Sequence, residues 1–375
     1  DHWPRFRLRL FFEGIVVGIL SGTVISFFRW GLEMGTVWRQ WIYANVLASG
    51  GVLLNLSWFG VLLAAALLLW RLGIYEPNAG GSGIPQVKGV ILGAIRMRWL
   101  RILWVKLIGG IVGIGLGLSL GREGPSIQIG AVTAQGLSRA LGRTRMEERY
   151  LITAGASAGL AAAFNAPLAG VMFALEELHR NFSGVVLAPS MAAALLATMV
   201  SRYVFGRAPV FHFGMLPPFP LRYMWLVVIL GIIIGLAGVV FNKGLLNIHY
   251  FYDLPVFRNN YMRIAFALCM AGILGYVFPE VLGGGNDLVN SLYTLPLSLK
   301  LFAGLLIGKF LFTLVSYGCG VPGGFFLPML VLGALTGGIT DIVFVRLGLI
   351  SSYYLSNIVV ISMAAFFAAS VQSPV

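Results

Sequence analysis

Charge-free stretches alternate with short polar connectors along this chain. Six of these stretches are near or above the roughly 20 residues that a helix needs to cross about 30 Å of hydrocarbon. They cover residues 40–70, 150–175, 181–201, 223–242, 310–340 and 347–375. Lipid offers the backbone no hydrogen-bond partner, and the stretches lack the polar–apolar alternation of barrel strands. The pattern therefore predicts helices and an all-α integral membrane protein.

Other apolar segments are short or are interrupted by glycine. Residues 14–28 and 107–121 are two such segments, and we expect broken helices there rather than simple spans. Hydrophobic residues make up 58% of the chain and charged residues 10%, so no soluble domain fits between the apolar stretches. A bundle of the transporter or channel class is therefore expected.

The net charge of +13 is carried in the connectors. Three arginine clusters stand out: Arg5, Arg7 and Arg9; Arg96, Arg98 and Arg101; Arg143, Arg145 and Arg149. Positive residues flank membrane helices on the cytoplasmic side, so topology explains this charge better than nucleic-acid binding does. We expect cytoplasmic edges at these clusters, contact with a lipid membrane, and no nucleic-acid partner.

The sequence does not predict a catalytic or metal site. It contains no HExxH or GxSxG motif. The histidines are scattered near the ends of segments: His2, His179, His212 and His249. The two cysteines, Cys269 and Cys319, are far apart in apolar segments, which argues against a disulfide framework. We expect no enzyme activity, no catalytic residues, no metal and no organic cofactor.

The chain repeats itself at an offset of 203 residues. Seven positions are identical at this offset: Lys106/Lys309, Gly115/Gly318, Gly117/Gly320, Gly121/Gly324, Pro125/Pro328, Gly130/Gly333 and Ala131/Ala334. Most are glycines or prolines, which mark breaks in the backbone. We predict a single transmembrane domain (1–375) with one repeat at about 10–200 and a second at about 220–375. Internal repeats in membrane proteins commonly form a substrate site from discontinuous helices at their interface.

The ends of the chain suggest a fragment of a longer subunit. The sequence begins at Asp1 without methionine and stops at Val375 inside an apolar run. With four more residues of offset, Pro167 matches Pro374. We expect the second repeat to be truncated where the first continues from Pro167 to Glu177.

Three glycine- and proline-rich motifs have the chemistry of an anion site. They are GGSGIPQ at 80–86, GREGP at 121–125 and PGGFFLP at 322–328. Glycine lets the backbone turn, and proline suits the first turn of a helix. A helix that begins inside a membrane has unpaired amide N–H groups and a positive dipole end. Chloride needs such donors without a full countercharge that would trap it.

Single residues of these motifs also allow a structural interpretation. Ser82 is a candidate hydroxyl ligand, but a serine before a helix is also a common cap. Phe326, taken alone, is more typical of packing. Three motifs together, two of them related by the repeat, favour an anion site over kinks.

The motifs GSGIP, GREGP and GxFxP, together with GLAAAFNAPLAGVMFALEE at 159–177, strongly resemble the CLC family of chloride channels and chloride/proton antiporters. The resemblance covers nearly the whole chain in the same order. It implies an inverted (antiparallel) double repeat of tilted and broken transmembrane helices, of the prokaryotic type without visible cytosolic regulatory domains. It also implies a homodimer with one pathway per subunit, bound chloride ions, and residence in the plasma (inner) membrane of a prokaryote.

The resemblance assigns anion-binding residues motif by motif: Ser82, Gly83 and Ile84 in GSGIP, Glu123 and Gly124 in GREGP, and Phe325 and Phe326 in GxFxP. Within this set Ser82 is the inner ligand and Glu123 is the gating glutamate. The family also has a tyrosine ligand near its C-terminal end, which we expect beyond Val375.

Energy considerations support a gating role for Glu123. A carboxylate at mid-membrane costs about 2.5–3.5 kcal/mol on insertion scales, whereas a helix N-terminus returns about 0.3–1 and at most about 2 kcal/mol. Burial disfavours the ionised form and amide hydrogen bonds favour it, so the two protonation states can lie close in energy. Ionised, Glu123 would plug the chloride site; protonated or displaced, it would open the pathway. The alternative is a permanent pair with Arg122.

Glu176 and Glu177 bear on the choice between a channel and an antiporter. In the family pattern the second glutamate is the internal proton-transfer residue of antiporters, and channels commonly have an apolar residue there. Glu177 therefore favours chloride/proton exchange. The alternatives are a passive chloride channel of the same fold, an antiporter for another anion such as nitrate or fluoride, and two acids that only end a helix beside Arg180.

Overall fold

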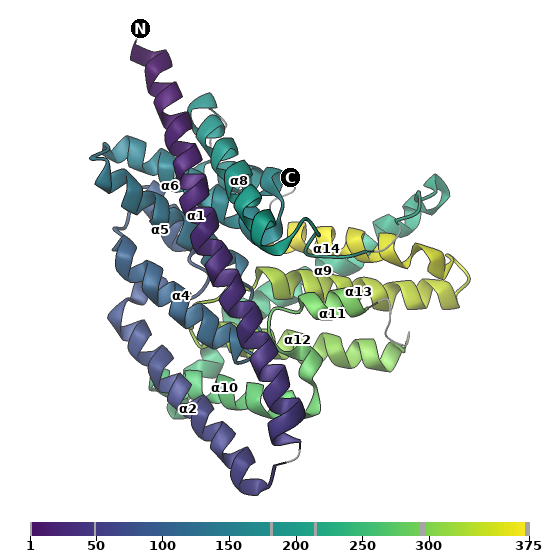
Figure 1. Cartoon of the computed structure of the whole chain (residues 1–375). Helices are drawn as coiled ribbons and strands as arrows, with labels where there is room; N and C mark the ends of the chain where they lie inside the picture. Colours follow the sequence, from purple (N-terminus) through teal and green to yellow (C-terminus); the bar gives the residue numbers. More distant parts are fainter. Residues whose placement is uncertain (1, 49, 181–182, 214–215, 293–297, 372–375) are drawn as a thin grey trace. The chain divides into compact units, whose positions relative to one another are not determined.

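The regular elements that the structure describes are all helical (Figure 1). The computed structural model describes residues 2–48, 50–180, 183–213, 216–292 and 298–371. Within these ranges, eight helices are long and apolar enough to cross a membrane. The prediction of an all-α, multi-span membrane protein is confirmed.

The chain divides into two compact units. The first contains residues 1–116 and 121–210, and the second contains residues 211–319 and 325–375. Two short segments belong to a different unit from their neighbours in the sequence. Gly117–Leu120 is part of the second unit, and Gly320–Gly324 is part of the first.

The first unit contains eight α-helices and three short helical turns among its described residues. They are α1 (His2–Trp41), the π-helical η1 (Ile42–Leu47), α2 (Val52–Tyr75), the 3₁₀ turn η2 (Pro77–Ala79), α3 (Ile84–Ile91), α4 (Trp99–Gly115), α5 (Glu123–Ala140), α6 (Arg145–Phe164), α7 (Pro167–Phe173), the π-helical η3 (Ala174–His179) and α8 (Gly184–Phe205).

The second unit has the elements η4 (Leu221–Tyr223), α9 (Met224–Tyr252), η5 (Pro255–Phe257), α10 (Asn260–Val277), η6 (Pro279–Val281), α11 (Asn286–Ser291), α12 (Leu299–Gly318), α13 (Phe326–Arg346), η7 (Ser352–Tyr354) and α14 (Leu355–Val371). Here the η elements are 3₁₀ turns.

The order of elements in the first unit recurs in the second. The run η2, α3, α4, α5 and α6 corresponds to η6, α11, α12, α13 and α14. A fully buried lysine has the same role in each run. Lys106 Nζ donates to the carbonyls of Ala79 (3.0 Å) and Gly81 (2.7 Å). Lys309 Nζ donates to those of Val281 (2.9 Å) and Gly283 (2.6 Å).

This recurrence supports an internal repeat, whose boundaries at about 10–200 and 220–375 stay a prediction. Pro374, the expected match of Pro167, lies outside the described residues.

The expected break in residues 14–28 is wrong. These residues lie in the middle of α1, which is continuous, and α8 lies beside it (Figure 1). A Cβ added to Gly14 would lie 2.6 Å from the carbonyl oxygen of Pro189, and one added to Gly18 would lie 2.5 Å from that of Ala193. The glycines therefore allow α1 and α8 to approach closely, as small residues commonly do between membrane helices.

Three charge-free stretches also contain a helix boundary, so each is not one helix as predicted. The stretch 40–70 is divided before Val52, and the stretch 310–340 is divided between α12 and α13. The stretch 150–175 is divided at Asn165, whose φ is +59°. Absence of charge indicates burial or lipid contact, and it does not report helix continuity. The break expected in residues 107–121 is present, because α4 ends at Gly115.

The backbones of α5 and α6 are in very close contact. A Cβ added to Gly130 would lie 2.1 Å from the carbonyl oxygen of Gly155, and one added to Gly155 would lie 2.2 Å from that of Gly130. A Cβ on Gly159 would lie 2.2 Å from the carbonyl oxygen of Ser126. Backbone oxygens cannot swing aside as the end of a side chain can. This contact holds α5, the helix that begins at Glu123.

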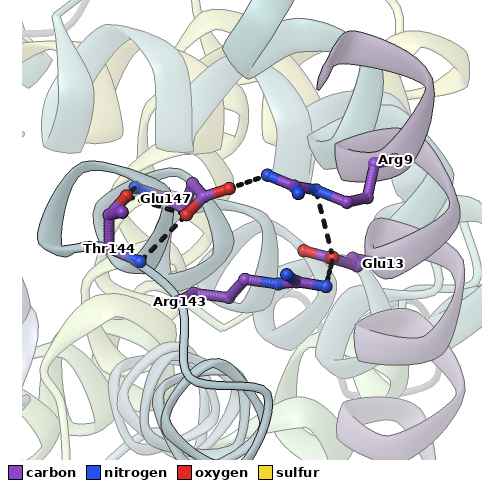
Figure 2. Close-up of polar contacts among 5 residues, drawn as sticks. All are labelled: Arg9, Glu13, Arg143, Thr144 and Glu147. Atoms are coloured by element: carbon purple, nitrogen blue, oxygen red, sulfur yellow. Dashed lines mark hydrogen bonds and ion pairs between the residues drawn. The ribbon is translucent and has the colours of Figure 1, made fainter. Parts of the chain in front are cut away.

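A cluster of charged residues joins the start of α6 to α1 (Figure 2). Thr144 caps α6: the Glu147 carboxylate accepts from the Thr144 N–H (2.9 Å) and hydroxyl (2.8 Å), and it also accepts from Arg9 of α1. Arg143 pairs with Glu13 of α1 at 2.5 Å. Burial alone would raise the pKa of Glu147, but the hydrogen bonds from Thr144 and the charges of Arg9 and Arg143 hold that pKa below its ordinary value.

Replacing Gly155 by alanine is expected to destabilise the protein, because the added Cβ overlaps a backbone oxygen of α5. Overpacking of this kind costs about 1–3 kcal/mol. The matched control is Gly231→Ala in α9, where no atom lies within 4 Å of an added Cβ. Thermal unfolding in detergent should show a lower midpoint for Gly155→Ala and no loss for Gly231→Ala. Equal midpoints would contradict the close contact.

The Glu147 cluster is expected to make stability depend on pH. Because the folded-state pKa of Glu147 is depressed, its contribution is present above the unfolded-chain pKa and is lost as the pH falls through the folded-state value. Wild type should unfold at a higher temperature than Glu147→Gln at about pH 7, and the gap should shrink below about pH 4. The exposed Glu280→Gln is the control. A difference in unfolding temperature that stays constant over this pH range would contradict the stabilising role of the Glu147 cluster.

Candidate functional site

Three glycine-containing loops of the first unit are hydrogen-bonded to one another. Gly121 and Gly324 exchange both backbone hydrogen bonds, at 2.6 Å and 2.9 Å between nitrogen and oxygen. The N–H of Gly323 donates to the carbonyl of Gly81 at 3.0 Å. The loops before α3 and α5 are thus linked through the segment Gly320–Gly324.

The start of α3 requires glycine at its cap. Gly83 has φ +86°, in the left-handed region, and a Cβ there would lie 2.3 Å from Oε1 of Gln128. The Ser82 hydroxyl accepts from the N–H of Ile84 at 3.4 Å. The capping interpretation of Ser82 therefore has an observed contact, although a long one. Accepting this bond leaves the hydroxyl hydrogen available to donate, so capping and anion binding are compatible.

The start of α5 lies against Ser82. Glu123 is the first residue of α5 and is fully buried. A Cβ added to Gly124 would lie 2.9 Å from both the Cβ and the carbonyl oxygen of Ser82. The first N–H groups of a helix have no partner within it, and the positive end of the helix dipole lies there. The first unit thus brings together the residues predicted in GSGIP and GREGP.

Arg122, the residue before α5, has partners on other helices. Its guanidinium lies 3.8 Å from the Glu33 carboxylate of α1 and donates to the carbonyl of Ala163 in α6 at 3.3 Å. These contacts direct the arginine toward α1 and the end of α6. The alternative in which Arg122 is permanently paired with Glu123 stays a prediction.

Phe325 and Phe326 belong to the second unit, where they begin α13. The Phe326 ring packs against Phe367, with ring centroids 4.7 Å apart. The Phe325 ring packs edge-on against Tyr317 at 5.1 Å. Both rings therefore have packing roles, and any role in binding an anion would rest on backbone amides.

Glu177 pairs with a lysine that is not among the site residues predicted from the sequence. Its Oε1 lies 2.6 Å from Nζ of Lys88 in α3. The expected alternative partner, Arg180, has φ +51° and lies directly after η3. One sequence signal pointed to Lys88: it is the sole charged residue between Glu76 and Arg96. A lone charge on a short apolar helix calls for a partner.

The short helix α3 connects the two groups of residues. Its first end is formed by Ser82 and Gly83, and Lys88 lies five residues after Gly83, or about 8 Å along a helix. The side chains of Lys88 and Glu177 are 26% and 25% exposed, whereas Glu123 is fully buried. The Glu177 carboxylate is therefore partly accessible at the surface of this chain, and Glu123 is enclosed by it. Among the described residues, no group of three His, Cys, Asp or Glu side chains could hold a metal ion.

Comparison with known proteins identifies the family. Residues 60–375 match the family described as "Voltage gated chloride channel". The chain is 33% identical to the H⁺/Cl⁻ exchange transporter ClcA of Vibrio vulnificus, over 98% of this chain and 80% of that protein. It is 35% identical to the H⁺/Cl⁻ exchange transporter ClcA of Salmonella agona, over 98% of this chain and 79% of that protein.

Solved structures agree with this match. A slow cyanobacterial Cl⁻/H⁺ antiporter has a TM-score of 0.90 and 31% identity, covering 98% of this chain and 87% of that one. A CLC-type fluoride/proton antiporter has a TM-score of 0.79 and 23% identity with the same coverage, which shows the shared fold. The chain therefore belongs to the voltage-gated chloride channel (CLC) family, and it is a multi-pass membrane transporter of anions rather than an enzyme.

Proposed function

We propose that this protein exchanges chloride for protons through a pathway gated by Glu123, with Glu177 as the internal proton-transfer residue. The observation that carries the proposal is α3, which begins just after Ser82, beside α5, and holds Lys88 against Glu177. The similarity to proteins named H⁺/Cl⁻ exchange transporters supports chloride and protons as the transported ions.

Chloride would be bound by hydrogen-bond donors and not by a fixed countercharge. The Ser82 hydroxyl keeps a hydrogen to donate, and Gly83 and Ile84 set its position. The amides at the start of α5, including that of Gly124, supply further donors. In the second unit the corresponding donors are the amides of Phe325 and Phe326. Bound chloride ions are expected, and no other cofactor.

Glu123 would couple proton binding to chloride passage. Its carboxylate lies at the buried start of α5, where a chloride ion would seek the same donors. An ionised Glu123 therefore competes with chloride for the site. Proton binding removes its charge and with it the electrostatic gain from the helix end. One event then delivers a proton and clears the way for an anion.

Glu177 would pass protons between water and the interior. About a quarter of its side chain is exposed, so water can deliver a proton there. Its Oε1 lies 2.6 Å from the ammonium of Lys88, so this pair has to separate before the carboxylate can turn toward the interior. The same pair also fits a passive chloride channel in which Lys88 and Glu177 only tie α3 to η3. Proton coupling separates the two functions.

We further propose a homodimer in the plasma membrane of a prokaryote, with one pathway in each subunit. The large apolar side chains exposed on α9, such as Val228, Ile232 and Leu236, suit contact with lipid or with a second subunit. Neither assembly nor compartment alters the assignment of the pathway residues.

In liposomes without an imposed proton gradient, a chloride gradient should drive proton movement. The proton flux is measured with a pH electrode and the chloride flux with a chloride electrode. Glu123→Gln removes the titratable group and keeps its size, so proton movement should fall to background while chloride flux persists. Wild-type chloride flux with no proton movement would leave a passive channel. Normal coupling in Glu123→Gln would remove Glu123 from the mechanism.

Glu177→Gln should abolish proton transport and leave chloride flux, because the outer gate at Glu123 is intact. The neighbouring Glu176→Gln is the matched control and should keep coupled exchange. The measurement is the ratio of proton to chloride flux for each variant. Loss of coupling in Glu176→Gln alone would mean that the roles of the two glutamates are reversed.

A further inference from the structure

A cavity of about 810 Å³ lies in the first unit, away from Ser82 and Glu123. It is lined by the end of α2, by η2, by the loop after α3, and by the facing ends of α5 and α6. Its volume falls within the range of about 300–1,000 Å³ that is typical of small-molecule sites. Five arginines contribute to the lining: Arg96, Arg98, Arg139, Arg145 and Arg149.

The first two turns of α6 present one face to this cavity. Arg145, Glu148, Arg149 and Ile152 all line it, and their spacing of three and four residues places them on a single side of the helix. Glu147 belongs to another side and pairs with Arg9 of α1 (Figure 2). The cluster with α1 therefore fixes the helix that presents two of the five arginines.

The positive charge of the cavity is only partly neutralised. Arg139 pairs with Glu148 at 3.2 Å. Glu76, the second acid in the lining, is buried and accepts from the side chain of Asn78 at 3.2 Å. The four remaining arginines are in no ion pair with a carboxylate of the described residues. Five cations against two acids give the lining a formal charge of +3.

A buried amide side chain in the lining has a hydrogen-bond acceptor without a donor. Gln135 lines the cavity and is 1% exposed. Its Nε2 donates to Glu148 at 2.7 Å, while its Oε1 has no hydrogen-bond partner. A buried acceptor without a donor is destabilising. A turn of the Gln135 side chain would bring this oxygen to the cavity, where a hydroxyl or amino hydrogen of a ligand would satisfy it.

We propose that this cavity binds a phosphate ester that also carries hydroxyl groups. Guanidinium groups bind phosphate oxygens in pairs of parallel hydrogen bonds, and several arginines suit a multiply charged anion. A single chloride ion is too small and too weakly charged to engage arginines from α6 and from the loop after α3 together. The ester can come from a soluble metabolite or from a lipid headgroup, since basic pockets beside membrane helices also bind headgroups. The inference does not depend on proton coupling.

Calorimetric titration of the full chain in detergent, in phosphate-free buffer, tests the proposal. The soluble arm uses ATP and glucose 6-phosphate, and the lipid arm uses short-chain phosphatidylglycerol with phosphatidylcholine as its neutral control. Saturable binding of one ligand per chain is expected in at least one arm, and the arm that binds identifies the source. Absence of saturable binding in both arms would overturn the proposal.

Two double variants locate the site from different elements. Arg145→Gln with Arg149→Gln alters α6, and Arg96→Gln with Arg98→Gln alters the loop after α3. Each should weaken binding by about tenfold or more, because each removes hydrogen bonds to a charged group. The control, Arg71→Gln with Arg258→Gln, removes two exposed arginines outside the lining and should keep wild-type affinity.

Chloride flux in liposomes shows which variants are folded, since none of these arginines belongs to the proposed pathway. If one double variant does not fold, the other decides the question. Equal weakening by the control pair would mean that the ligand responds to overall charge, and the assigned cavity would be wrong.

Discussion

Backbone hydrogen bonding in a medium without water is the constraint on which the rest of this structure depends. Each interrupted helix exposes peptide groups that lipid cannot satisfy. In the first unit the loops around Gly81 and Gly121 bond to the segment Gly320–Gly324. Lys106 and Lys309 supply further donors to loop carbonyls within their own units. These hydrogen bonds satisfy peptide groups in the loops that precede α3, α5 and α13.

Close packing between helices holds these loops and helix ends in place. Glycines bring α5 against α6, and Gly124 brings the start of α5 against Ser82. The short helix α3 then relates the buried start of α5 to the partly exposed Glu177 through Lys88. A helix of only eight residues has little freedom to bend, so its two ends move together. The proposed anion site and the proposed proton route would thus share one rigid element.

The sequence predicted the helical class and the helix breaks at the glycine–proline motifs, because those residues act locally on the backbone. It could not predict contacts between distant segments. Glu177 was weighed against its neighbour Arg180, but the observed partner, Lys88, is 89 residues away. Glycines were ambiguous too: Gly18 permits contact with α8, whereas Gly83 forms a turn. The arginine clusters were interpreted only as topology signals, and the convergence of four of their nine arginines on one cavity required the fold.

The segment Gly320–Gly324 has a consequence for biosynthesis. The last helix of the first unit, α8, ends at Phe205, so residues 206–319, 114 in all, lie between that helix and Gly320. Until the ribosome has added them, the N–H groups of Gly323 and Gly324 are missing, so the carbonyl of Gly121 lacks its partner and that of Gly81 has only Lys106. Domains usually fold in the order of their synthesis. Here the hydrogen bonds that link the three loops can form only after residues 211–319 of the second unit have been translated.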